Sequence, residues 1–67
     1  MLVVYRERNM ITPFKCIDVE KQVFLERLWF HGNILYGYKD RFNTVAIAKE
    51  DIICIKDQTT GFMIFPE

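Results

Sequence analysis

The sequence predicts an all-β fold, built as a small barrel or a bent antiparallel sheet. Short segments rich in β-branched and aromatic residues recur along the 67 residues, which is typical of strands. Turn-forming residues separate these segments at intervals of about 8–12 residues. The chain has no internal repeat, low-complexity tract or linker, so residues 1–67 are predicted to form a single compact domain.

The first segment, residues 2–7, is predicted to be a strand because it combines valine, leucine and tyrosine. Arg8-Asn9 is the predicted tight turn, since asparagine tolerates left-handed backbone angles. Residues 10–17 form the next predicted strand, which bends or lies at an edge because Pro13 lacks an N–H. One face of that strand would carry Met10, Thr12, Phe14 and Cys16.

Residues 18–33 fit either a helix or two strands. In the helical interpretation, Asp18 caps the N-terminus and Gly32 or Asn33 ends the helix. Good helix formers dominate its first half. The apolar face would consist of Phe24, Leu25, Leu28 and Trp29.

In the strand interpretation, which we favour, residues 19–22 form a hairpin loop. Gly32-Asn33 then makes a type II′ turn. That turn places residues 29–31 opposite residues 34–36.

The remaining elements are short and clearly separated. Predicted strands cover residues 34–38, 44–48, 52–56 and 62–65, with polar loops or turns at residues 39–43, 49–51 and 57–61. Val45 and Ile47 share one face of their strand. These elements predict a five- or six-stranded SH3-like barrel, in which the terminal strands pair and leave no open edge. The alternative is an α+β fold with one helix over about residues 19–31 on an antiparallel sheet.

Charge and hydropathy limit the partners. Nine basic and nine acidic residues give a formal net charge of zero, whereas proteins that depend on phosphate contacts usually carry a basic excess. No run approaches the roughly 18 apolar residues of a membrane span. The N-terminus lacks the basic region and cleavage site of a signal peptide. We therefore expect a cytoplasmic protein without a membrane partner.

The chain is too short to hide all its apolar side chains. A domain of this size buries only about 60% of the surface of its unfolded chain, yet it contains six Phe, three Tyr and one Trp. The excess should form an exposed patch, which marks an interface. We expect a homo-oligomer, with a dimer as the simplest form, or a stable protein partner.

Catalytic and metal-binding patterns are missing from the sequence. Cys16 and Cys54 lie 38 positions apart without a CxxC neighbour, and His31 is the only histidine, so no metal site is predicted. Both cysteines are interpreted as small buried hydrophobes, because a disulfide is unexpected in a reducing compartment. His31 is interpreted as a partly exposed side chain next to a turn. Phosphate-binding loops and hydrolase motifs are absent from the sequence, so we expect no enzyme, cofactor or small-molecule substrate.

One cluster combines aromatic and basic residues. Tyr36 and Tyr38 project from the same face of a predicted strand, and Lys39, Arg41 and Phe42 follow in the loop. Gly37 leaves room for another backbone or a planar group to approach the opposite face. Tyrosine, tryptophan and arginine commonly anchor protein interfaces, and rings beside cations also suit single-stranded nucleic acid. A third interpretation is that Tyr36 or Phe42 plugs the end of the barrel.

The same segment resembles a known signature. Residues 35–43, followed by Val45 and Ile47, are similar to the first conserved signature of Sm-like RNA-binding barrels, which contains a Gly-aromatic pair, an Asp and an Asn. The Asp-to-Asn spacing differs by one residue, and residues 52–56 lack the second signature. The resemblance supports a small barrel, and no RNA-binding residue is assigned from it.

The function predicted from the sequence is that of a small protein-binding or regulatory module without catalysis, of a kind common in bacteria and their phages. It would act through an apolar-aromatic patch, and the candidate binding residues are Trp29, Tyr36, Tyr38, Lys39, Arg41 and Phe42. The alternative is a small β-barrel that binds single-stranded RNA or DNA. An enzyme is the least favoured interpretation.

Overall fold

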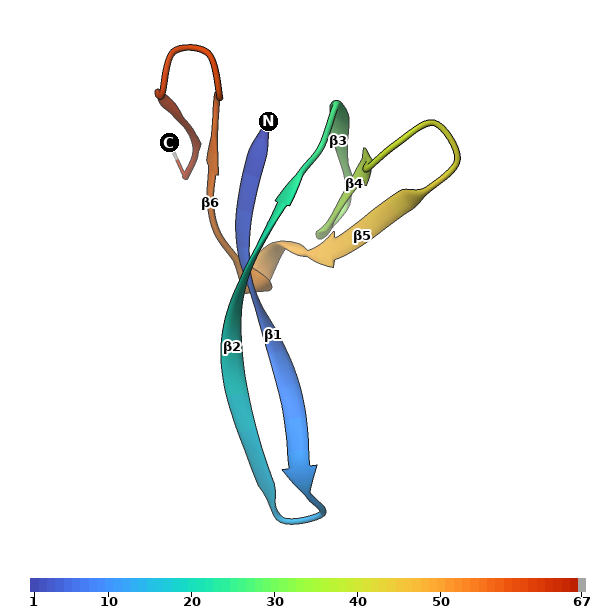
Figure 1. Cartoon of the computed structure of the whole chain (residues 1–67), viewed down its shortest axis with the longest axis vertical. Coiled ribbons are helices and arrows are strands. Elements are labelled where there is room, and N and C mark those ends of the chain that lie inside the picture. The colour runs from blue at the N-terminus through green and yellow to red at the C-terminus, as the bar shows by residue number, and fades with distance from the viewer. Residues whose placement is uncertain (67) are drawn as a thin grey trace.

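The computed structural model describes residues 1–66 and consists of seven strands in two antiparallel sheets (Figure 1). The elements are β1 (Leu2–Thr12), β2 (Lys15–Phe24), β3 (Arg27–His31), β4 (Ile34–Tyr38), β5 (Thr44–Ala48), η1 (Lys49–Asp51), β6 (Ile52–Lys56) and β7 (Met63–Phe65). No α-helix occurs in residues 1–66, and η1 is a single 3₁₀ turn. The all-β prediction is confirmed, and the α+β alternative is wrong.

The strands do not close into a barrel. Sheet A has the order β2-β1-β6-β7 and sheet B the order β3-β4-β5. β1 pairs with β6, not with the terminal strand β7. Open edges therefore remain on both sheets, where the predicted barrel would have had none. The structure also has seven strands in place of the five or six expected.

The first hairpin is longer than predicted. β1 continues through the proposed turn at Arg8-Asn9, because these residues pair with Asp18 and Ile17 of β2. The chain reverses instead at Pro13 and Phe14. A proline in a turn loses no ladder hydrogen bond and has its φ fixed in advance. The Phe14 amide also donates a hydrogen bond of 3.3 Å to the Thr12 hydroxyl.

Residues 19–22 are neither a loop nor part of a helix. They lie inside β2, whose partner is β1 along its whole length. Within this segment Lys21 makes a cross-strand ion pair with Glu7, and the neighbouring Asp18 lies 3.5 Å from Arg8. Pairing with β1 thus overrides local helix propensity.

The second hairpin agrees with the strand interpretation. Trp29 lies opposite Tyr36, and His31 lies opposite Ile34. Gly32 has φ of +61°, and no non-glycine residue in the described part of the chain has positive φ, as a type II′ turn requires. The predicted strands at residues 34–38, 44–48 and 52–56 are confirmed with the same bounds.

The hydrophobic core lies where the two sheets meet. β4 and β5 contribute Leu35 and Ile47, which are 0% and 5% exposed. The other fully packed members are Val3, Leu25, Ile52 and Ile55. Val45 packs against this cluster as well, so the predicted inner face of residues 44–48 is confirmed.

The outer half of the β1–β2 hairpin projects from the body as an arm (Figure 1). Every residue from 6 to 18 is exposed. Its apolar side chains include Phe14 at 98% and Met10 at 72% exposure. An isolated two-stranded hairpin is only marginally stable in water, so this arm has little support from the rest of the chain.

Residues 1–66 contain no helix with the length and apolar character needed to cross a membrane.

Candidate functional site

Three aromatic side chains cluster on one side of sheet B. Trp29 stands directly opposite Tyr36, and Tyr38 lies two residues further along β4, so strand alternation puts all three on the same face. The Trp29 ring centroid is 5.9 Å from that of Tyr36 and 5.5 Å from that of Tyr38. We call these three residues the aromatic face. Trp29 is 40% and Tyr38 37% exposed, so the rings are open to a partner.

The aromatic face points away from the core because Leu35 and Gly37, which alternate with the tyrosines, point inward. A Cβ at Gly37 would lie 2.6 Å from Leu25 Cδ1 and 2.9 Å from the Arg27 carbonyl oxygen. The predicted close approach of another backbone at Gly37 is therefore confirmed. It lets Leu25, which is 1% exposed, pack directly beneath the strand that carries both tyrosines.

β5 places small side chains beside the rings. Ala46 is the partner of Tyr36, and Thr44 is the partner of Tyr38. Both are exposed, and both side chains are much shorter than an aromatic side chain. On this face of sheet B, β3 and β4 therefore carry large rings, and β5 carries only small side chains.

Arg27 is a member of the site that the sequence analysis missed. It pairs with Tyr38 across the strands and, together with Leu28, Trp29 and Tyr38, lines an open depression of about 490 Å³. The strands of sheet B contain no Asp or Glu, so Arg27 gives this face a positive charge. The Gly32-Asn33 turn could have revealed it, because extending the pairing of Trp29 with Tyr36 by two residues reaches Arg27 and Tyr38.

The other predicted site residues lie in the loop between β4 and β5. Lys39, Arg41 and Phe42 are all exposed, and Phe42 is 89% exposed, so it does not plug the fold. In the described residues, no ring stacking or cation–π contact joins them to the aromatic face. The structure brings Trp29 together with the two tyrosines and leaves the three loop residues at the end of the same sheet.

Asp40 fixes the conformation of this loop. Its Oδ1 accepts hydrogen bonds from the backbone N–H groups of Phe42 and Asn43, at 2.9 and 3.0 Å. Its Oδ2 accepts one from Asn43 Nδ2 at 2.8 Å. The hydrogen bond from the Asn43 side chain, followed by that from the Phe42 amide, holds the pKa of the Asp40 carboxyl below its ordinary value of 3.8.

Asp40→Asn is expected to reduce the loss of stability in acid. Because the pKa is lower in the folded state, the carboxylate stabilises the fold above pH 3.8, and this contribution disappears as pH falls through the folded-state pKa. Urea unfolding at about pH 6 and about pH 3 should show a smaller drop for the variant than for the wild type. An equal drop in both proteins would show that the carboxylate is not engaged in the folded chain.

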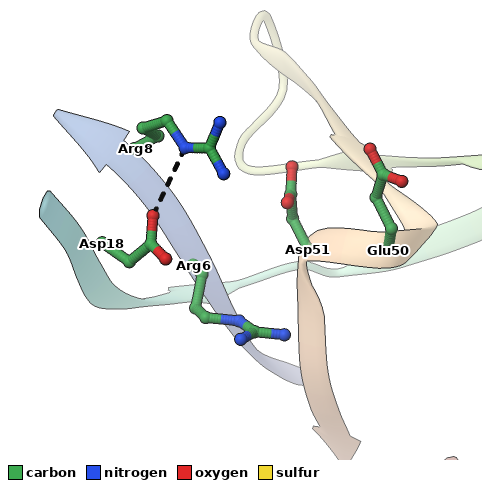
Figure 2. Close-up of a pocket in the computed structure, with 5 residues that line it drawn as sticks. All are labelled: Arg6, Arg8, Asp18, Glu50 and Asp51. Atoms are coloured by element: carbon green, nitrogen blue, oxygen red, sulfur yellow. Dashed lines mark ion pairs between the residues drawn. The ribbon is translucent and has the colours of Figure 1, made fainter. Parts of the chain in front are cut away.

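A second concave region lies between the base of the arm and η1 (Figure 2). Two arginines and three carboxylates line this cleft of about 460 Å³: Arg6, Arg8, Asp18, Glu50 and Asp51. The Arg8–Asp18 ion pair already satisfies part of this charge. Because the lining mixes both signs of charge, it suggests no particular reaction.

The structure places the cysteines and the histidine apart from any cluster. No group of three metal-binding side chains occurs in residues 1–66. Cys54 is a buried free thiol, as predicted, whereas Cys16 is exposed on the arm. The interpretation of Cys16 as buried is wrong because its strand extends beyond the core. His31 is exposed next to the β3–β4 turn.

Comparisons with protein-family models, with curated proteins and with solved structures give no match for this chain.

Proposed function

We propose that this chain is a cytoplasmic protein-binding module without catalysis, which attaches to or covers a partner protein through the aromatic face. The observation that carries the proposal is the Trp29–Tyr36–Tyr38 cluster on sheet B, in which Trp29 and Tyr38 are exposed and Tyr36 is half-buried. Large rigid side chains of this kind supply most of the affinity at protein interfaces. A regulatory role and an SH3-like arrangement of the strands belong to the same proposal.

Uncovered apolar surface elsewhere on the molecule supports the same conclusion. Phe14, Phe42 and Phe62 are 74–98% exposed. A monomer usually limits such surface, since large exposed apolar patches mark interaction sites.

The charges around the aromatic face indicate what the partner presents. Arg27 lies within the face, and Lys39 and Arg41 lie at the end of the sheet. The nearby Asp40 carboxylate is already bound to Asn43 and its own loop. The expected partner surface therefore has an apolar centre with carboxylates at its rim, which matches the usual anatomy of an interface.

Single-stranded nucleic acid is the second candidate, because stacked rings next to cations also bind bases and phosphates. The formal net charge of zero makes this ligand less favourable, since proteins that bind through phosphate contacts usually carry a basic excess. We therefore treat nucleic acid as an alternative outcome of the test below.

Trp29→Ala is expected to weaken partner binding tenfold or more, the loss that defines an interface anchor. The immobilised chain would first be used to isolate a partner from a lysate of its source organism. The purified partner is then titrated while the fluorescence anisotropy of a dye on Cys16, the exposed thiol on the arm, is followed, because Trp29 is the only tryptophan in the chain and its own fluorescence is lost in the variant. Phe62→Ala is the matched control, because Phe62 is 74% exposed but lies outside sheet B.

The outcomes separate the candidates. Saturable binding of a protein that is lost in Trp29→Ala and retained in Phe62→Ala supports the proposal. Equal binding by both variants would place the interface elsewhere. A fluorescence change with labelled single-stranded oligonucleotides, weakening steeply with salt and unmatched by any protein, would replace the proposal with the nucleic-acid alternative.

A further inference from the structure

The outer edge of β5 is an open and unprotected sheet edge. β5 lies at the end of sheet B, paired only with β4, and its sequence, Thr-Val-Ala-Ile-Ala, has no charge and no proline. Natural proteins usually protect such an edge with lysine, proline or a bulge. The absence of all three devices from β5 indicates that another strand covers it.

The other open edges in residues 1–66 are protected or short. β7 has three residues and is followed by Pro66. β3 begins with an arginine, and β2 carries two lysines and two carboxylates. The free part of β1 contains Arg6, Glu7 and Arg8. β5 is thus the uncharged edge of full strand length.

The backbone groups that β5 offers can be identified from its pairing with β4. The Lys39 amide donates to the Asn43 carbonyl at 3.0 Å, and the Lys49 amide donates to the Asn33 carbonyl at 2.8 Å. These two pairs bracket the ladder, in which hydrogen-bonded pairs alternate with non-hydrogen-bonded ones. Val45 and Ile47 therefore direct their N–H and C=O groups toward β4. By the same alternation, Thr44, Ala46 and Ala48 direct theirs outward.

We propose that the strand that covers β5 is β5 of a second copy of this chain, in antiparallel pairing about a two-fold axis at Ala46. In an antiparallel pair, the side chains of opposed residues lie on the same face of the sheet. Side chains alternate along a strand, so the two-fold axis must place one residue opposite the same residue of the second copy. An axis between two residues would oppose side chains from different faces. With the axis at Ala46, that residue faces Ala46 of the second copy, and Thr44 faces Ala48. All three outward-directed residues of each copy then exchange hydrogen bonds. Moving the axis to Val45 or Ile47 leaves one of them without a strand partner.

Side chains across this pairing are compatible. The opposed pairs are Ala with Ala, Thr with Ala, and Val45 with Ile47, so no like charges meet. Ala46 is exposed and small, which lets the two strands approach without a clash. The interface uses the same patch on both copies, as a two-fold dimer requires.

Open space is present along this edge. A groove of about 280 Å³ is lined by residues 45–48 of β5, by residues 5–8 of β1 and by Asp51. In Figure 1, β5 runs from η1 in one direction, and the arm, which passes beside η1, extends in another. Among the described residues, β5 pairs with β4 alone, so β1 is not hydrogen-bonded to its outer edge.

The dimer would also complete the proposed binding surface, and this part of the inference rests on the proposed function. Trp29, Tyr36 and Ala46 form one row across sheet B. Pairing of the two copies would continue this row through Ala46, Tyr36 and Trp29 of the second copy. The result is a trough with a floor of small β5 side chains and an aromatic wall on each side. With strands about 4.8 Å apart, the two walls stand about 14 Å from each other at the backbone of β4.

Cysteine cross-linking tests the register. In a Cys16→Ser background, which removes the exposed thiol, Ala46→Cys alone should give a disulfide-linked dimer on mild oxidation, since opposed Cα atoms lie about 5.5 Å apart. Thr44→Cys alone and Ala48→Cys alone should not cross-link, because each faces the other position. An equal mixture of these two variants should cross-link.

A charge test checks the same axis without a cross-link. In a dimer of Ala46→Arg, or of Ala46→Asp, two like charges would face each other across the axis and oppose pairing. Each variant should therefore sediment as a monomer of 8.0 kDa, while the wild type sediments at twice that mass. Mixing the two variants should restore the dimer. Thr59→Arg, which adds the same charge in an exposed loop, is the matched control and should stay dimeric. Far-UV circular dichroism confirms that each variant is folded.

The proposal is overturned if the wild type sediments at 8.0 kDa at every concentration, if Ala46→Arg remains dimeric, or if Thr44→Cys alone cross-links as readily as Ala46→Cys. Partner binding is measured separately through Trp29. A dimer that binds no protein contradicts the proposed function alone, and a monomer that binds one contradicts the dimer alone.

Discussion

Leu35→Ala is expected to lower the free energy of unfolding by about 2–5 kcal/mol, the range for a leucine deleted from a packed core. Leu35 is 0% exposed and lies in β4, the central strand of sheet B. A chain of this length has a total stability of roughly 3–10 kcal/mol. The loss of this one side chain would therefore remove a large part of the free energy of unfolding. It would also remove the core packing beneath the aromatic face.

Urea unfolding followed by the fluorescence of Trp29 measures this effect. Ile53→Ala is the control, because Ile53 is 39% exposed and lies outside the core cluster. It should cost less than about 1 kcal/mol. If both substitutions lowered the free energy of unfolding equally, Leu35 would be no better packed than the partly exposed Ile53. That result would contradict the core between sheet A and sheet B.

Gly37→Ala is expected to destabilise the fold by about 1–3 kcal/mol through overpacking. The added methyl group would meet Leu25 Cδ1 at 2.6 Å and the Arg27 carbonyl oxygen at 2.9 Å. The leucine side chain can rotate away, but the carbonyl belongs to the ladder between β3 and β4. The substitution should therefore spread those strands and also weaken partner binding.

A double-mutant cycle with Leu25→Ala tests the cause. Removing Leu25 Cδ1 relieves one of the two clashes, so Gly37→Ala should cost less in the Leu25→Ala background, with a coupling energy of about 0.5–3 kcal/mol. The carbonyl clash remains, so the cost should not vanish. Strict additivity in the cycle would show that Gly37 is not packed against Leu25.

The elements predicted correctly are those specified by local chemistry. The Gly32-Asn33 turn fixes the β3–β4 register by itself, because a two-residue type II′ turn leaves one way to pair the flanking residues. From that register, Trp29 and Tyr36 follow as neighbours. The bounds of β5 follow from its alternation, with Val45 and Ile47 on one side and small residues on the other.

The first hairpin could not be placed because its turn lacks a strong local signal. Arg8-Asn9 and Pro13-Phe14 are both acceptable turns, and the choice depends on cross-strand pairs with β2. The bulge between Met10 and Thr12 also breaks the alternation on which the prediction relied. Residues 19–22 suit a helix locally, and pairing with a distant strand decides their conformation.

The open barrel and the extent of the site depend on contacts between elements far apart in the sequence. Whether β1 meets β6 or β7 is not encoded in either strand alone. The loop residues Lys39, Arg41 and Phe42 were grouped with the tyrosines because they are close in sequence, but Asp40 holds their loop at the end of the sheet. Arg27 was missed because it is distant in sequence and adjacent in the sheet.

The central claim is that a protein covers the aromatic face, and sedimentation of the labelled chain in a lysate of its source organism tests it most directly. A fluorophore on Cys16, the exposed thiol on the arm, leaves sheet B untouched. The claim predicts that the labelled wild type sediments as a complex heavier than twice its 8.0 kDa mass, and that Trp29→Ala does not. Identical sedimentation of the two proteins, at one or two chain masses, would contradict it.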